Sequence, residues 1–212
     1  MKRIGLLIAL VVCFVNGSAS NANAQEQGGR KRMPSLSADD VAASKEPLSI
    51  APAGALTDFY YTSDKADPVG QGTTLQLQLG QMSVNVVPDS RYKAGPINHV
   101  KLVVSGKGGQ LFELWFSTEK MNVNLVPGSY DGAGRVEFTK YMQPGMSISG
   151  NGRGCLDARG NFSFLQADFH YQSGKLVADG IAVEFEQHCG DRQAGLRGHL
   201  YYNYVPPTNS SH

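Results

Sequence analysis

The chain has 212 residues, of which 17% are charged, and its formal net charge is only +1. A balance so close to zero creates no strong basic field, which argues against nucleic acid or an anionic membrane surface as a partner. Three cysteines are present, and their pairing depends on which of them remain after export.

Residues 1–24 have the order of features that is typical of a secretory signal peptide. Lys2 and Arg3 form a charged start, an apolar run occupies 4–15, and a small-residue stretch ends in Ala-Asn-Ala at Ala24. The run is shorter than the ~20 residues that a membrane-spanning helix needs. We predict cleavage after Ala24, export to the periplasm or the extracellular space, and no membrane insertion after cleavage.

Cleavage would remove Cys13 and leave Cys155 and Cys189 as a single pair. It would also remove two basic residues and take the formal net charge from +1 to −1. Two cysteines in an oxidising compartment usually pair, so we predict a Cys155–Cys189 disulfide. The bridge would close a loop of about 34 residues, which the chain-entropy model values at roughly 3–4 kcal/mol of stability.

The mature chain is predicted to contain one domain between two irregular segments. Residues 25–54 are rich in Gly, Ser, Pro and charge, and bury too little apolar surface to offset the cost of ordering, so we interpret them as a flexible linker. The tail, 205–212, is interpreted as disordered. The remaining 55–204 has the length of one ordinary domain.

Apolar and polar side chains alternate along most of this domain, as they do in half-buried strands. The alternation predicts a hairpin over 74–86 with a tight turn at Gly80 and Gln81, and a second hairpin over 97–116 around the turn Ser-Gly-Lys-Gly-Gly. Three further strands are predicted over 161–171, 176–189 and 196–204.

Segments rich in Gly and Pro separate these strands, and no stretch after residue 50 keeps the apolar spacing of a helix. Strands that recur every 10–15 residues or so favour an all-β fold. We predict an antiparallel β-sandwich with one disulfide, and a barrel as the second possibility.

The strand that ends at Cys189 contains the densest set of chemically active side chains. Alternation turns its apolar residues inward and places Glu184, Glu186 and His188 on the outer face. Two carboxylates about 7 Å apart match the spacing in inverting glycosidases, and the same set could hold a metal. A polar outer face is, however, the default for an antiparallel strand. We therefore predict no catalytic residue and no metal, with Glu186 and His188 as weak metal candidates.

The other ionisable residues form no recognised motif, and no cofactor is predicted. The histidines lack H-x-H or H-E-x-x-H spacing, although His170, His188 and His199 on adjacent strands would leave a zinc site possible. Asp64 and Asp67 lack the spacing of an EF-hand and are interpreted as parts of an Asp-Pro turn.

Trp115 is predicted on the polar face of its strand, beside Glu113, because its neighbours Phe112, Leu114 and Phe116 form the apolar face. Carbohydrate-binding β-sandwiches often stack a sugar ring on such an exposed aromatic side chain. The candidate ligand-binding residues are Trp115, Tyr60 and Tyr201. The alternative is that Trp115 only covers an edge of the domain, since isolated apolar surface residues are normal.

Three stretches resemble a recurrent β-sandwich segment of secreted bacterial proteins. They are SGNGRGC at 149–155, FEQHC at 185–189 and AGLRGHLYYN at 194–203, which match SGDGRGC, FEQHC and ALxGxxxYN with Gly195 as an extra residue. The resemblance extends over about 59–203. No activity is established for that segment, and it often occurs beside other extracellular modules, which implies a binding or structural accessory role.

These features predict an exported, non-catalytic module that binds a glycan, a cell-envelope component or a protein partner. Two alternatives stay open. One is a glycoside- or ester-type hydrolase whose site the sequence does not reveal, and the other is a secreted protease inhibitor that presents the loop 88–96.

The export prediction is tested by the N-terminus of the protein recovered outside the cytoplasm. N-terminal sequencing should start at Gln25, and Ala24→Phe should prevent cleavage, because the signal peptidase site requires a small residue there. A mature protein that retains residues 4–15 would contradict the prediction.

Overall fold

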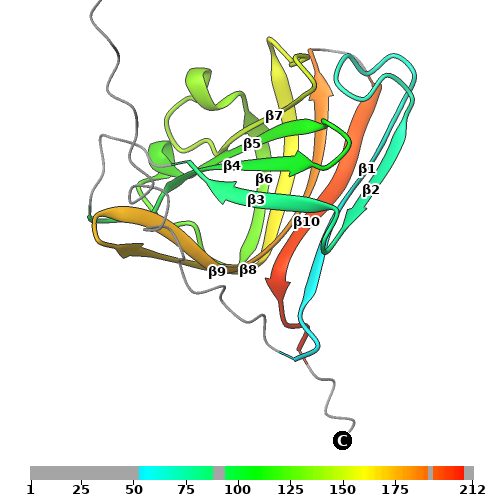
Figure 1. Ribbon diagram of the computed structural model, residues 1–212. Coiled ribbons are helices and arrows are strands. Elements are labelled where there is room, and N and C mark those ends of the chain that lie inside the picture. Colours follow the sequence, from blue (N-terminus) through cyan, green and yellow to red (C-terminus); the bar gives the residue numbers. More distant parts are fainter. Residues whose placement is uncertain (1–52, 88–93, 191–192, 208–212) are drawn as a thin grey trace, which may run out of the picture. The chain divides into compact units, whose positions relative to one another are not determined.

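The structure is a computed structural model, and it describes residues 53–87, 94–190 and 193–207 (Figure 1). By its internal contacts the chain divides into Met1–Leu48 and Ser49–His212, and every described residue belongs to the second unit. The predicted signal peptide lies outside the described residues. So do most of the predicted linker, most of the loop 88–96 and most of the C-terminal tail.

The described residues form ten strands and two short 3-10 helices, which confirms the all-β prediction. The elements are β1 Leu56–Ser63, β2 Thr74–Gln78, β3 Met82–Val86, β4 His99–Gly106, β5 Leu111–Ser117, η2 Glu119–Met121, β6 Gly128–Gly134, η3 Val136–Phe138, β7 Gly145–Gly150, β8 Ala158–Gln172, β9 Lys175–Cys189 and β10 Gly195–Tyr204. The strands form one mostly antiparallel sheet in the order β2-β1-β10-β9-β8-β6-β7-β5-β4-β3, which is not closed into a barrel.

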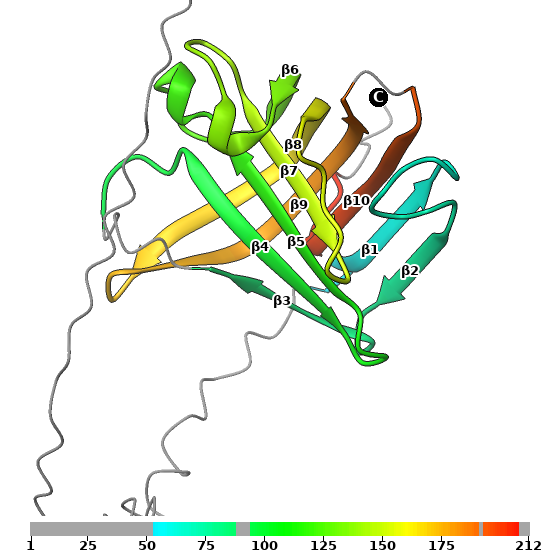
Figure 2. The same cartoon turned by 90° about the horizontal axis from the view of Figure 1, so that it is seen from above.

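This single sheet folds over on itself instead of forming the two separate sheets that the sandwich prediction implied. The rings of Phe59 on β1 and Phe112 on β5 lie 5.0 Å apart, although five strands separate them in the sheet order. Figures 1 and 2 show β3, β4 and β5 running across β8, β9 and β10. The inner face of the folded-over sheet therefore encloses one core.

The hairpin predicted over 74–86 is wrong in its pairing. β2 pairs with β1, and β3 pairs with β4, so the two strands lie at opposite edges of the sheet. They are joined through Gly80, whose φ of 82° suits glycine, and Gln81. Alternation located both strands because each buries one face, but it contains no information on which neighbour each strand will pair with.

The other predicted strands are present. β4 and β5 form the second hairpin, and β8, β9 and β10 coincide with the three predicted C-terminal strands. β6 and part of β7 lie in segments where Gly, Ser and Pro are frequent, a composition that favours turns over strands. In the fold, β6 is a short irregular strand that contributes Tyr130 and Ala133 to the core.

The junction between β6 and β7 is the weakest point of the sheet, because the two strands share a single parallel pair, Gly134 with Gly145. The side chain of Gln187 on β9 compensates for the missing partner. Ile148 N–H donates to Gln187 Oε1 at 2.7 Å, and Gln187 Nε2 donates to the Ile148 carbonyl at 3.0 Å. A fully buried side-chain amide thus takes the place of a neighbouring peptide group.

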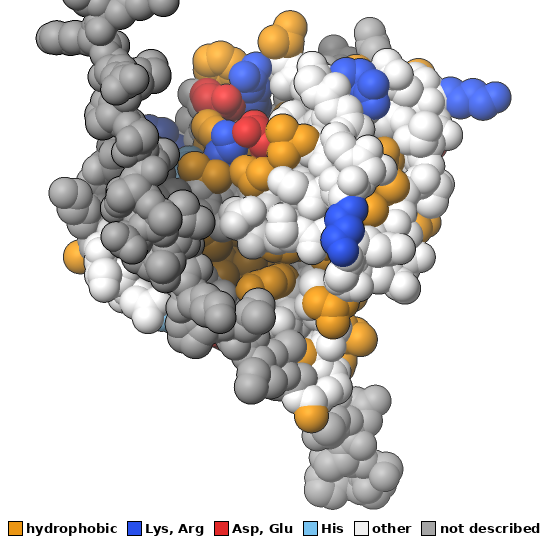
Figure 3. All heavy atoms as spheres, in the orientation of Figure 1, with side chains coloured by type: hydrophobic (Ala, Val, Ile, Leu, Met, Phe, Trp, Pro, Cys, Tyr) orange, Lys and Arg blue, Asp and Glu red, His pale blue; other side chains and the backbone are white. Residues whose placement is uncertain are grey.

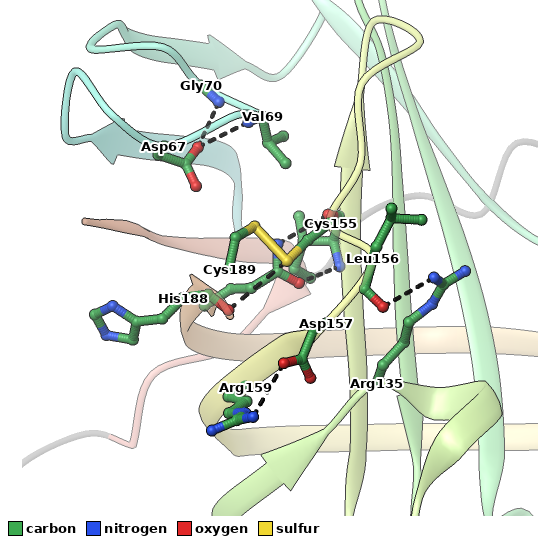
Figure 4. Close-up of a disulfide and its surroundings, with 12 residues drawn as sticks. Asp67, Val69, Gly70, Arg135, Cys155, Leu156, Asp157, Arg159, His188 and Cys189 are labelled. Carbon is green, nitrogen blue, oxygen red and sulfur yellow. Dashed lines mark hydrogen bonds and ion pairs between the residues drawn. A yellow bond between two sulfur atoms is a disulfide. The ribbon is translucent and has the colours of Figure 1, made fainter. Parts of the chain in front are cut away.

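The predicted disulfide is present and joins the end of β9 to the segment that follows β7 (Figure 4). Cys155 lies between β7 and β8, Cys189 ends β9, and their Cα atoms are 5.5 Å apart. The bridge and the Gln187 contact are two residues apart on one face of β9, so together they attach β9 to β7 and to the segment that follows it.

Replacing Gln187 with Leu should lower the free energy of unfolding by about 2–6 kcal/mol, because two buried main-chain groups of Ile148 would each lose a partner at about 1–3 kcal/mol. Chemical denaturation with the disulfide intact measures this loss. Glu186→Gln, on the outer face of the same strand, is the control and should change stability by no more than about 0.5 kcal/mol. Equal losses in the two variants would contradict the assigned role of Gln187.

Candidate ligand-binding site

The strand register arranges the outer side chains of β1, β10, β9 and β8 in rows across the sheet. One row contains Thr62, Arg197, Glu186 and Asn161. The next row contains Tyr60, His199, Glu184 and Ser163. Residues more than a hundred positions apart in the sequence therefore share one surface.

A depression of about 380 Å³ lies between these two rows, and all eight of their residues line it. Phe162, Phe185 and Gly198 complete its lining. A Cβ atom at Gly198 would collide with the main-chain carbonyl oxygen of Tyr60 and press on the ring of Phe185. Glycine at this position therefore lets β10 approach β1 closely.

An aromatic stack forms one side of the site. The ring of His199 lies 5.6 Å from that of Tyr60 and 4.3 Å from that of Tyr201, with nearly parallel planes in both cases. His199 Nε2 is 2.9 Å from Asp58 Oδ2, and the carboxylate of Asp58 also accepts hydrogen bonds from Gln76. The His199 ring is therefore fixed in orientation by stacking and by a carboxylate.

A charged network forms the adjoining side. Arg197 Nε donates to Glu186 Oε1 at 2.8 Å, and Arg197 Nη1 donates to Asp64 Oδ2 at 3.2 Å. The main-chain N–H of Gly195, and then Arg197, hold the pKa of Asp64 below its ordinary value. The hydrogen bond to Asp64 in turn raises the pKa of Arg197. His188 Nε2 lies 3.0 Å from Glu186 Oε1 and completes the network.

Tyr201 connects the aromatic stack to the carboxylates. Its hydroxyl donates to Glu184 Oε1 at 2.9 Å. Burial of the side chain, and then the hydrogen bond to Glu184, raise the pKa of Tyr201 to about 12. The phenol therefore stays protonated at neutral pH and acts as a donor to Glu184.

The structure brings together only two of the three aromatic residues that the sequence suggested as ligand contacts. Tyr60 and Tyr201 meet through His199, whereas Trp115 lies on β5, with β9, β8, β6 and β7 between it and β10 in the sheet order. The half-buried Trp115 instead contacts Lys101, whose Nζ is 4.8 Å from the ring centre, and the edge of His99.

Asp58, Asn161 and Arg197 lie at the site, although the sequence pattern did not predict them there. The alternation along β10 could have indicated Arg197, because residues 197, 199 and 201 share one outer face of the strand. No comparable signal marked Asp58 or Asn161, because the order of the strands, and not local pattern, places them beside the site.

The histidines and carboxylates do not assemble into a metal centre in the part of the chain that the structure describes. No group of three or more His, Cys, Asp or Glu side chains is arranged to hold a metal there. Glu186 and His188 do lie together, but Arg197 shares the same carboxylate oxygen. His170 lies away from the other histidines of this sheet and is paired with Asp179 at 3.1 Å.

Asp67 also has a structural role in its loop. Its Oδ1 accepts hydrogen bonds from the main-chain N–H groups of Val69 and Gly70, as an aspartate before a proline does in a turn (Figure 4). The side chain is almost fully buried. This arrangement matches the predicted Asp-Pro turn.

Comparison of the chain with protein-family models, curated proteins and solved structures gave no match. Among the described residues, no helix has both the length and the apolar character that crossing a bilayer requires.

The raised pKa of Tyr201 gives a direct test of the site geometry. Absorbance titration of the folded protein at 295 nm should contain one tyrosine step near pH 12, and Tyr201→Phe should remove it. Glu184→Gln should move this step toward the ordinary pKa but not fully restore it, because burial is the larger cause. A step that Glu184→Gln leaves unmoved would refute the Tyr201–Glu184 hydrogen bond.

Proposed function

We propose that the protein is an exported, non-catalytic module that binds a carbohydrate on the outer face of β1, β10, β9 and β8. The observation that carries the proposal is the depression of about 380 Å³ in which the aromatic ring of Tyr60 lies beside several fixed polar groups. Those polar groups belong to Asn161, Ser163, Glu184, Glu186, Arg197 and His199.

The chemistry of the lining fits a polar, hydroxyl-rich ligand. Carboxylates accept hydrogen bonds, the Arg197 guanidinium donates them, and the Asn161 amide does both, so a sugar with several hydroxyl groups finds partners of each kind. Glu186 and Asp64 are both paired with Arg197, so the carboxylates outnumber the guanidinium and the site keeps an excess of acceptors for hydroxyl groups. The aromatic side chain of Tyr60 supplies an apolar surface beside these groups.

The arrangement of the carboxylates supports binding over hydrolysis. Glu184 and Glu186 are neighbours on one face of β9, whereas glycosidases place an acid and a second carboxylate on opposite sides of the scissile bond. The ring of His199 is oriented by Asp58, but the hydroxyl of the nearby Ser163 is bonded to Ser129. An activated nucleophile would need a hydroxyl bonded to the histidine.

Two further observations agree with an accessory role outside the cytoplasm. Disulfides persist mainly in exported proteins, and Cys155 and Cys189 are bonded. The FEQHC and SGNGRGC stretches resemble segments found beside extracellular modules. We also infer that the folded-over sheet serves as the two layers of a sandwich, with the candidate site on the outside of one layer.

Binding is tested with the purified mature protein on an array of bacterial, plant and animal glycans, followed by affinity electrophoresis in the polysaccharide that gives the strongest signal. We expect Tyr60→Ala to weaken binding at least about tenfold, or 1.4 kcal/mol. Tyr60→Phe keeps the stacked ring, so it should retain most of the affinity. Thermal unfolding of both variants checks that the fold is intact.

Trp115→Ala is the matched control, since it removes the aromatic residue that lies on β5. It should leave binding unchanged. Loss of binding in Trp115→Ala but not in Tyr60→Ala would transfer the site to β5. Release of reducing ends from a bound glycan, abolished by Glu184→Gln, would show that the protein is a hydrolase.

A further inference from the structure

Strand β3 is one of the two edges of the sheet, and part of its main chain has no partner. Val87 N–H donates to Lys101, and the Gln81 carbonyl accepts from Lys107, so odd-numbered residues turn their main-chain groups toward β4. Val84 and Val86 therefore direct their N–H and C=O groups away from β4. Within the described part of the chain, none of these four groups is hydrogen-bonded.

This edge lacks the features that usually prevent strand-to-strand association. Residues 82–86 contain no charge, no proline and no bulge, and their register with β4 is continuous. The opposite edge of the sheet is β2, which ends at Gln78, and it is partly covered. There Gln81 satisfies both main-chain groups of Gln78: Gln81 Oε1 accepts from Gln78 N–H, and Gln81 N–H donates to the Gln78 carbonyl. In the view of Figure 3, the area over β3 is mostly white, the colour of the backbone and of uncharged polar side chains, with hydrophobic side chains below it and a basic side chain at one end.

We propose that β3 pairs antiparallel with β3 of a second copy of this chain, about a two-fold axis that passes through Asn85. In this register Val84 of one copy lies opposite Val86 of the other, and the four free main-chain groups of each copy form hydrogen bonds with those of the partner. The two Asn85 side chains lie opposite each other on the exposed face.

The side chains of β3 complement those of a second β3 that runs antiparallel to it. This favours a second copy of the chain over an unrelated peptide as the partner. Val84 and Val86 are half-buried against the core, so their pairing across the axis would extend the apolar layer. The exposed Ser83 and Asn85 are neutral, so no like charges meet. An isologous contact of this kind closes after two copies.

The pairing would leave both candidate ligand-binding sites open, because no residue of β3 lines them. A dimer would therefore present two sites to one ligand. If the ligand is a repeating polymer, the second contact is made at a high effective concentration, which increases the apparent affinity.

Cysteine cross-linking tests the register with single substitutions on an exposed face. Asn85→Cys should form a covalent dimer under mild oxidation, because a non-hydrogen-bonded antiparallel pair places its Cα atoms about 4.5 Å apart, within disulfide range. Ser83→Cys is the matched control and should not, because the two copies of residue 83 would be offset by four residues. Peptide mapping confirms that Cys155 and Cys189 stay paired.

Sedimentation equilibrium of the mature protein tests the same pairing without new thiols. Val84→Pro removes an N–H that has no partner in the monomer, so the fold should persist while the dimer dissociates about tenfold more readily. Val84→Thr retains the N–H and should dimerise like the unmodified protein. Equal cross-linking of Asn85→Cys and Ser83→Cys, or a protein that stays monomeric at every concentration, would overturn the proposal.

Discussion

The hydrogen bonds between the Gln187 side chain and the main chain of Ile148 are the constraint on which the rest of this structure depends. The sheet must fold over to enclose a core, and it does so where β6 and β7 share only one residue pair. A break of that kind leaves buried peptide groups without partners, which costs about 1–3 kcal/mol for each group. One glutamine amide satisfies two of them, because it has the donor and acceptor of a peptide group.

The FEQHC stretch is explained by the two faces of a single strand. Its inward residues hold the fold, with Phe185 in the core, Gln187 bonded across the junction and Cys189 in the disulfide. Its outward residues, Glu186 and His188, belong to the charged network beside the depression. A residue change in this motif should therefore affect either stability or the site, depending on whether its position is odd or even.

Local pattern was sufficient for most strands, and the cysteine count after signal cleavage was sufficient for the disulfide, but neither predicted how the strands are arranged. Alternation depends on neighbours in the chain, so it identified β8, β9 and β10 and the inward turn of Cys189. Pairing depends on the whole fold, which is why the Gly80 turn was assigned to a hairpin although it joins the two edges of the sheet. Tyr60 and His199 became neighbours through strand order alone, and the same order separates Trp115 from them.

The position of the candidate site on β9 and β10 favours the proposed binding. β9 is anchored from its inner face at Gln187 and again at Cys189, so the outer side chains project from a strand that cannot easily shift. The Glu186 carboxylate and the His199 ring are further held by Arg197 and Asp58. A ligand that meets groups already fixed in place does not have to order them, and more of the interaction energy remains as affinity. The glutamine that completes the fold thereby also prepares the surface on its opposite face.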